Sequence, residues 1–245
     1  MSRHSHWAKI KRGKGATDSN RGVLFSKHAR LITVASREGG GDPAFNFKLR
    51  LAVDRAKGDG MPKDAIERAI ARGTGTGEGM TMETVTYEGF APGGAAVLVE
   101  CVTDNRNRAL NEVKAVFRDH GVSLGNEGSV RWQFERRGVL RVAATSPKLQ
   151  ASSREEIELS LIEAGAEDIR EEDGGLVVLT AVDGLQRAKE AAEQAGLTVN
   201  DAGMEWVAKQ SVDVPELDRE KLESFLAALD ELDDVQEVYT NARGY

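Results

Sequence analysis

Apolar residues recur every three or four positions in three stretches between residues 20 and 72, which is the spacing of one face of an α-helix. The first predicted helix runs from Asn20 to Glu38 and ends at a triple glycine. We expect the second helix over Pro43–Gly58, with Asp42 as its N-cap, and a third that begins at Pro62. Three short helices joined by tight turns indicate a small helical bundle.

Beyond the glycine-rich tract Gly73–Gly79, which is typical of a linker, strand and helix patterns alternate. The predicted strands are Thr84–Phe90, Ala95–Thr103, Val130–Phe134, Val139–Ala143, Ala166–Arg170, Leu176–Thr180, Leu197–Asn200, Met204–Lys209 and Val235–Thr240. The predicted helices are Asn105–His120, Ser153–Ala164, Leu185–Ala195 and one that contains Leu222–Leu229.

The order of these elements predicts the fold class, which is α+β and multidomain. From Val139 to Asn200 the order is β-α-β-β-α-β, a ferredoxin-like unit, and the elements on either side complete a second α+β domain around it. The predicted domains are a flexible basic arm (1–20, the N-terminal arm), a helical domain with a three-helix bundle (21–78), an α+β domain (79–138 plus 203–245) and an inserted ferredoxin-like domain (139–202).

Composition narrows the cellular setting. No apolar run approaches the ~18–20 residues that span a bilayer, and the start of the chain lacks the apolar centre of a secretory signal. The single cysteine, Cys101, cannot form an internal disulfide, so a reducing compartment is expected. We therefore expect a cytoplasmic protein with no membrane partner.

Charge is distributed unevenly, although the net charge is −7. The chain through Arg72 has sixteen Lys and Arg against seven Asp and Glu, and the remainder has seventeen against thirty-three. A basic end of this kind can face a polyanion while the acidic remainder discourages other contacts.

The strongest candidate chemistry lies in the N-terminal arm, where five cations surround Trp7 and no acid occurs before Asp18. Cations neutralise phosphates and release counterions, and an aromatic ring can stack on an unpaired base. The alternative is a solvated tail, in which Trp7 would have no use. The candidate nucleic-acid-binding residues are Arg3, His4, His6, Trp7, Lys9, Lys11, Arg12, Lys14, Arg21, Lys27, Arg30, Arg106 and Arg108.

Two further tracts leave alternatives open. In Thr103–Arg108, Asp104 or Asn105 is a natural helix N-cap, whereas Arg106 and Arg108 beside the positive end of a helix suit an anion. The tract Tyr87–Gly94 reads as hairpin turn chemistry, with a contact role for its tip as the alternative.

The sequence shows no group of residues typical of a catalytic site or a cofactor site. No nucleophile is paired with a base, and Cys101 lies in a predicted core strand where an inert thiol is expected. His4 and His6 do not complete a metal site, and His28 and His120 suit structural roles. The acidic runs, including 230–234, read as solvated faces. We expect a protein that is not an enzyme and needs no metal or cofactor.

Several motifs together resemble one family, the YebC/PmpR family of bacterial regulatory proteins. The matching segments read HSHWAKIK, GGGDP, MPKDAIERAI, YEGFAPGG, LVECVTDNRNR and GNEGSVRWQFERRGV, and they cover His4 to about Val139. The arm departs from the family pattern at Gly13, Ser19 and Asn20, and Phe47 stands where the family often has a proline.

The resemblance implies three domains and a regulator of gene expression that binds nucleic acid. Family members have been described as DNA-binding transcriptional regulators, and others have been linked to translation on ribosomes stalled at proline-rich stretches; relatives include the mitochondrial translational activator of cytochrome oxidase subunit one. Ribosomal RNA and DNA are therefore both candidate partners, and we favour the ribosome. A protein-interaction adaptor is a further alternative, and we expect a monomer.

Overall fold

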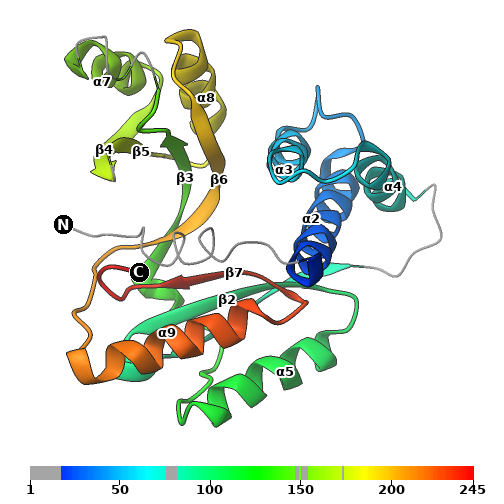
Figure 1. Cartoon of the computed structure of the whole chain (residues 1–245), viewed down its shortest axis with the longest axis vertical. Coiled ribbons are helices and arrows are strands. Elements are labelled where there is room, and N and C mark those ends of the chain that lie inside the picture. The colour runs from blue at the N-terminus through cyan, green and yellow to red at the C-terminus, as the bar shows by residue number, and fades with distance from the viewer. Residues whose placement is uncertain (1–17, 76–81, 147–148, 150–153, 173) are drawn as a thin grey trace. The chain divides into compact units, whose positions relative to one another are not determined.

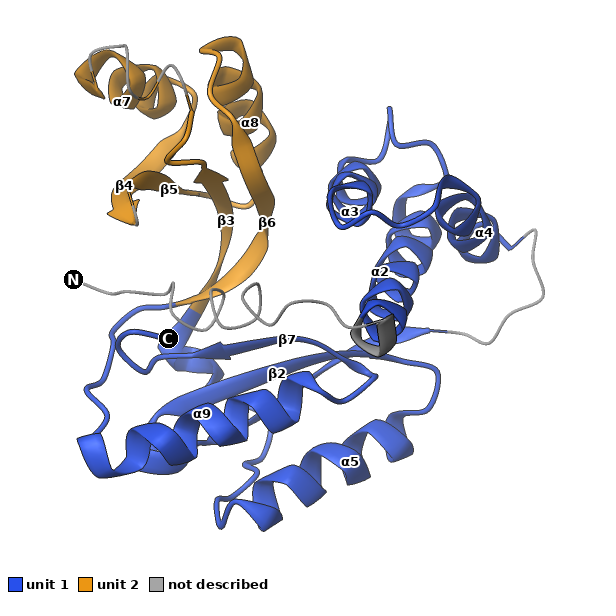
Figure 2. Cartoon of the chain, viewed as in Figure 1, with its two compact units in different colours: residues 1–134, 208–245 blue, residues 135–207 orange. Residues whose placement is uncertain are grey.

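The computed structural model describes residues 18–75, 82–146, 149, 154–172 and 174–245. The chain divides into two units, one that joins the part up to Phe134 with Ala208–Tyr245 and one that spans Glu135–Val207 (Figure 2). The second unit is an insertion in the first, and it extends beyond the predicted range 139–202 at both ends. None of the described helices has the length and apolarity that a membrane span needs.

The helical part of the first unit is a bundle of three helices, as predicted (Figure 1). These are α2 (Asp18–Gly39), α3 (Phe47–Gly58) and α4 (Lys63–Gly73). Ile32 of α2 packs with Leu49 and other apolar residues of α3 in a core that also includes α4. The last residues of the predicted N-terminal arm belong to α2, and the predicted linker Gly73–Gly79 falls partly on residues 76–81, outside the described residues.

The start of α3 differs from the prediction. The N-cap is Asn46 rather than Asp42, because the Asn46 Oδ1 atom accepts the backbone N–H of Leu49 at 3.1 Å. Asp42 instead closes a turn over Pro43, where its carboxylate accepts the N–H of Ala44 at 2.9 Å. The buried Asn46 amide also donates to two carbonyls near the end of α2, which the Asp42 carboxylate could not do.

The first α+β domain has an antiparallel sheet in the order β1-β2-β7, made of Glu83–Phe90, Ala96–Thr103 and Val235–Thr240. The helices of this domain are α5 (Arg106–Asp119) and α9 (Glu216–Asp230). The strand β7 thus comes from the C-terminal segment and completes a sheet begun before the insertion.

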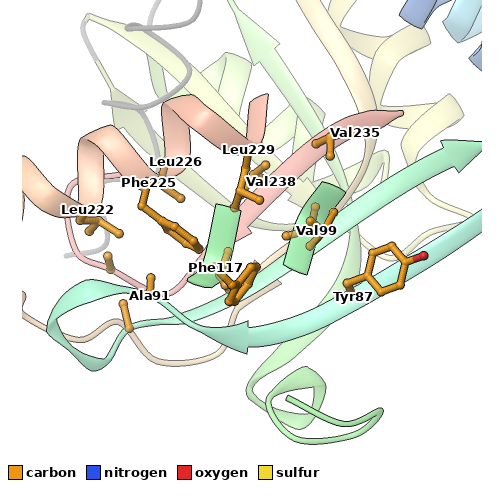
Figure 3. Close-up of a cluster of buried hydrophobic side chains, with 14 of the residues drawn as sticks. Tyr87, Ala91, Val99, Phe117, Leu222, Phe225, Leu226, Leu229, Val235 and Val238 are labelled. Carbon is orange, nitrogen blue, oxygen red and sulfur yellow. The ribbon is translucent and has the colours of Figure 1, made fainter. Parts of the chain in front are cut away.

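One apolar core joins the sheet to α5 and α9 (Figure 3). Phe117 of α5 and Phe225 of α9 meet edge to face, with ring centroids 4.9 Å apart. Leu222 and Leu226 of α9 and Val99 of β2 are fully buried beside them. Burial of apolar surface at about 25 cal/mol per Å² makes this cluster the main source of stability in the domain.

The second unit carries a four-stranded sheet in the order β4-β5-β3-β6, the order of a ferredoxin-like fold, which confirms the predicted inserted domain. Both β3 and β4 pair antiparallel to β5. Its elements are β3 (Phe134–Val142), α7 (Arg154–Glu163), β4 (Ala166–Glu172), β5 (Gly175–Thr180), α8 (Leu185–Gln194) and β6 (Val199–Ala208).

The prediction was wrong at β3 and at β6. It placed two short strands at each of these positions, whereas the structure has one continuous strand at each. A short 3₁₀ turn, Arg131–Gln133, precedes β3 in place of the predicted strand Val130–Phe134. Polar residues interrupt the apolar alternation, and one of them, Asp201 of β6, lies 3.6 Å from the Arg141 guanidinium of the neighbouring strand β3. Such cross-strand charge pairs support a strand that hydrophobicity alone does not reveal.

Candidate nucleic-acid interface

Many of the predicted contact residues lie in the N-terminal arm, outside the described residues. These are Arg3, His4, His6, Trp7, Lys9, Lys11, Arg12 and Lys14. The structure describes the other five, Arg21, Lys27, Arg30, Arg106 and Arg108, all in the first unit.

Lys27 is a buried cation and not a surface contact. Its residue is 7% exposed, and its ammonium donates to the backbone carbonyl of Asp230 at 2.5 Å and lies 3.5 Å from the Asp230 carboxylate. This pairing explains how α2 can bury a lysine, since a buried charge needs a partner and hydrogen bonds. Lys27 therefore links α2 to the end of α9 through these contacts with Asp230.

Arg30, one turn from Lys27, is held in the same way. Its guanidinium donates to the backbone carbonyl of Asp233 and lies 3.5 Å from the Asp234 carboxylate. The contact of Lys27 and Arg30 with nucleic acid stays a prediction, and in this structure acidic and carbonyl oxygens of the same chain bind both cations.

Asp234 is the centre of this network and is 1% exposed. Its carboxylate accepts from Arg108 Nε at 3.1 Å and Nη2 at 2.8 Å, and from the Thr103 hydroxyl at 2.9 Å. Arg108 also donates to Asp104 at 2.8 Å. Hydrogen bonds to Asp234 first, and to Asp104, raise the pKa of Arg108. A bidentate, charge-assisted pair of this kind fixes geometry as well as charge.

Helix capping and anion contact were the two roles left open for the tract Thr103–Arg108, and different residues of the tract suit each role. Asn105 is the N-cap of α5, and its side-chain oxygen accepts the Arg108 backbone N–H at 3.1 Å. Arg108 serves the internal ion pairs just described. Arg106 is exposed, and the described part of the chain offers its guanidinium no partner, so anion contact is left to Arg106 alone.

Arg21 is the remaining described cation of the predicted set. It is exposed near the start of α2, and its guanidinium lies 5.8 Å from the centroid of the Phe25 ring. A cation over an aromatic face is held in place while its donors stay available to solvent or to an anion.

Sequence reasoning missed the partners of these cations. The run 230–234 was interpreted as a solvated face, yet Asp230 and Asp234 hold Lys27, Arg30 and Arg108. The available signal was the opposite charge of the two halves of the chain, which favours internal pairing as well as a polyanion.

The tract Tyr87–Gly94 has a structural role. The Glu88 carboxylate is buried and accepts the backbone N–H groups of Gly128, Val130 and Arg131 at 2.8–3.0 Å. Burial raises the pKa of Glu88, but these hydrogen bonds outweigh it and hold the pKa below its ordinary value. These hydrogen bonds connect the motif YEGFAPGG to the motif GNEGSVRWQFERRGV.

The tip of that hairpin also favours turn geometry over a contact role. Gly93 has φ +78°, and a Cβ there would lie 2.7 Å from the side chain of Val214. Only glycine fits both the conformation and the close packing.

Trp132 is an exposed aromatic that the sequence reasoning placed in a strand. It lies in the 3₁₀ turn before β3, is 67% exposed, and donates its indole N–H to the Ser129 carbonyl at 3.1 Å. No pattern of apolar spacing distinguishes it from a core residue.

A short turn, residues 59–62 with Gly60, joins α3 to α4, which is the kind of connection found in helix–turn–helix motifs. The first two turns of α4, however, carry charges that neutralise one another. Arg68 pairs with Asp64 at 2.7 Å, and Lys63 pairs with Glu67 at 3.6 Å. Acidic residues in the first turns of a recognition helix oppose phosphate contact.

Chemistry other than binding has little support in the described residues. No group of three or more His, Cys, Asp or Glu side chains within them is placed to hold a metal ion. Cys101 is buried, and burial raises the pKa of its thiol to about 12. A thiol with that pKa is protonated at neutral pH and is a poor nucleophile.

Comparison with known proteins agrees with the resemblance seen in the motifs. The family profile described as the TACO1/YebC protein N-terminal domain matches residues 5–76, and that of the TACO1/YebC second and third domain matches residues 82–242. A protein from Desulfosudis oleivorans is 44% identical over 99% of this chain and 96% of its own, and one from Thermotoga maritima is 45% identical over 98% and 93%. Both are named probable transcriptional regulatory protein.

A solved structure has the same fold. The crystal structure of a conserved hypothetical protein from Aquifex aeolicus superposes with a TM-score of 0.86 at 44% identity, covering 98% of this chain and 97% of that one. Both family profiles, the relatives and this structure agree over nearly the whole chain. The chain therefore belongs to the TACO1/YebC family, whose named relatives are regulatory proteins.

Proposed function

We propose that this chain is a non-enzymatic regulator of gene expression that binds RNA on the ribosome, in the cytoplasm, and acts on synthesis stalled at proline-rich stretches. The stalled-synthesis role comes from the resemblance to YebC proteins linked to translation. The N-terminal arm supplies phosphate contacts, and Trp7 supplies a face for an unpaired base.

One observation carries the preference for RNA over an operator. Three of the five described candidate cations are engaged within the chain and not presented to a DNA groove: Lys27, Arg30 and Arg108 face Asp230 and Asp234. Operator recognition requires side chains presented to base edges by a fixed element. A basic arm without such an element recognises phosphates and unpaired bases, which suits ribosomal RNA.

A DNA-binding transcriptional regulator is the second candidate. The names of the relatives favour it, and so does the short glycine-containing turn between α3 and α4. This function predicts a preference for one operator over random duplex on the order of a thousandfold or more, whereas the RNA function predicts less than about tenfold among duplexes.

Binding to purified ribosomes tests the proposal. A variant with Lys9, Lys11, Arg12 and Lys14 changed to Glu should lose pelleting with ribosomes through a sucrose cushion, because reversed charges repel phosphates. Its thermal unfolding should stay unchanged, since no predicted core element includes these residues.

A matched control reverses four exposed cations of α5 and α9, namely Lys114, Arg118, Arg219 and Lys221. The control should still pellet with ribosomes. Equal loss in both variants would mean that binding follows net charge only, and full binding by the arm variant would contradict the proposal.

A further inference from the structure

An apolar groove lies between α2 and α4 in the helical bundle, on the side where α2 begins. Its volume is about 310 Å³. Phe25 and Ala29 of α2 line one wall, Ala65 and Ala69 of α4 line the other, and Met61 also contributes to it. A space of this size is in the range of small-molecule sites.

A glycine forms part of the wall of the groove. Gly22 lines it within the helix, and a Cβ at this position would meet no atom within 4 Å. Glycine inside a helix costs about 0.5–1 kcal/mol relative to alanine. Neither close packing nor a positive φ requires glycine here, so a side chain at this position would extend into open space beside the groove.

Arginines lie beside the groove, and among the described residues that line it none is acidic. Arg68 and Arg72 of α4 line it directly, and Arg21 lies over the ring of Phe25. Arg68 is paired with Asp64, but within the described residues neither Arg21 nor Arg72 has an ion-pair partner. An apolar cleft with a cationic rim is complementary to a flat, apolar group carried on an anionic backbone.

We propose that this groove holds an unpaired nucleobase of a single-stranded RNA, with the neighbouring phosphates bound by Arg21 and Arg72. The inference rests on the proposed RNA-binding function and assigns it a site. Bases stack on aromatic and apolar side chains regardless of sequence, and arginine supports both stacking and phosphate contact. Phe25 is the stacking surface.

The position of the groove along the chain supports this occupant. The N-terminal arm leads directly into α2, which begins at Asp18, and Gly22 follows within about one helical turn. An RNA strand held by the arm would therefore continue towards the groove. The arm itself is a poor occupant, because its cations and the arginines of the rim have the same charge.

Filling the groove tests the site. Gly22→Leu places a side chain in the open space, and leucine favours the helix more than glycine does, so thermal unfolding should occur at the wild-type temperature or above it. Affinity for a fluorescent single-stranded RNA of about ten nucleotides should fall about tenfold, in keeping with the loss of one stacked base. Binding to an RNA duplex should not change, since its bases are paired.

Gly58→Leu is the matched control, because Gly58 ends α3, does not line the groove and also has no atom near its Cβ position. It should bind both RNAs as the wild type does. Arg72→Ala should weaken single-strand binding and reduce the slope of log affinity against log salt by about 0.7.

The outcomes separate this inference from the function on which it rests. If the wild type binds RNA and Gly22→Leu binds it equally well, or loses duplex binding to the same degree, the groove is not a base site and the proposed function stands. If the wild type binds neither RNA nor ribosomes, both fail. Faster trypsin cleavage of the arm in free Gly22→Leu than in the wild type would show that the arm occupies the groove, which also overturns the inference.

Discussion

At the scale of single residues, the five described candidate cations fall into two groups. Lys27, Arg30 and Arg108 hold the fold together, while Arg21 and Arg106 stay exposed. Residue type and spacing could nominate all five as nucleic-acid contacts. They could not separate them, because the deciding partners lie about two hundred residues away for Lys27 and Arg30.

Removal of the Asp234 carboxylate charge tests this network. Asp234→Asn should lower the free energy of unfolding by about 1–3 kcal/mol, because Arg108 and Arg30 keep their charge and lose its counterion. Asp233→Asn is the control: its side chain is exposed and Arg30 uses only its backbone carbonyl. Thermal and urea unfolding should show a loss for the first variant only. Equal stability of the two would rule out the structural role of Asp234.

His28 should make stability depend on pH. Burial lowers its pKa below 6.5, although a 2.7 Å hydrogen bond to Asp59 opposes the shift. The unfolded chain therefore takes up a proton first, so the contribution of neutral His28 is complete above about pH 6.5 and declines as the pH falls.

Comparison with His28→Gln measures that contribution. The difference in the free energy of unfolding between wild type and His28→Gln should shrink between about pH 7.5 and about pH 5.5. Parallel pH profiles for the two proteins would contradict the buried, neutral histidine.

At the scale of elements, apolar periodicity predicted which helices and strands exist better than it predicted the residues at which they begin and end. The strand Val235–Thr240 and the helix α5 matched closely, because their apolar faces are complete. The predicted start of α3 was wrong because Asn46 and Asp42 are both good N-cap residues, and the hydrogen bonds that Asn46 donates near the end of α2 decide between them. The prediction divided β3 and β6 because polar residues interrupt their apolar alternation, and one of these residues, Asp201 of β6, is paired with Arg141 of the neighbouring strand β3.

Packing of α4 on α2 depends on Gly73, and a substitution can measure it. A Cβ at Gly73 would collide with the Thr33 carbonyl and lie 2.6 Å from the Ser36 Cβ. Gly73→Ala should therefore lower the melting temperature of the helical signal, with a cost of about 1–3 kcal/mol for overpacking. Gly58→Ala, which meets nothing, should leave it unchanged or raise it. Equal melting by circular dichroism would refute the close approach of the two helices.

At the scale of the whole molecule, the basic charges of the N-terminal half of the chain divide into two sets. Part of the basic half is neutralised by Asp230 and Asp234, and the N-terminal arm carries cations that precede the bundle. The arm stays a prediction from the run of cations alone, because residues 1–17 lie outside the described residues. The sequence could not predict the groove, because Gly22, Phe25 and Arg72 become neighbours only when α2 packs on α4.

Nuclease treatment of a lysate tests the central claim of RNA binding on the ribosome most directly. After sedimentation through a sucrose gradient, the protein should migrate with ribosomal particles, move to the top of the gradient after RNase treatment, and stay in place after DNase treatment. Migration with DNA that only DNase releases would contradict the account and favour the transcriptional function.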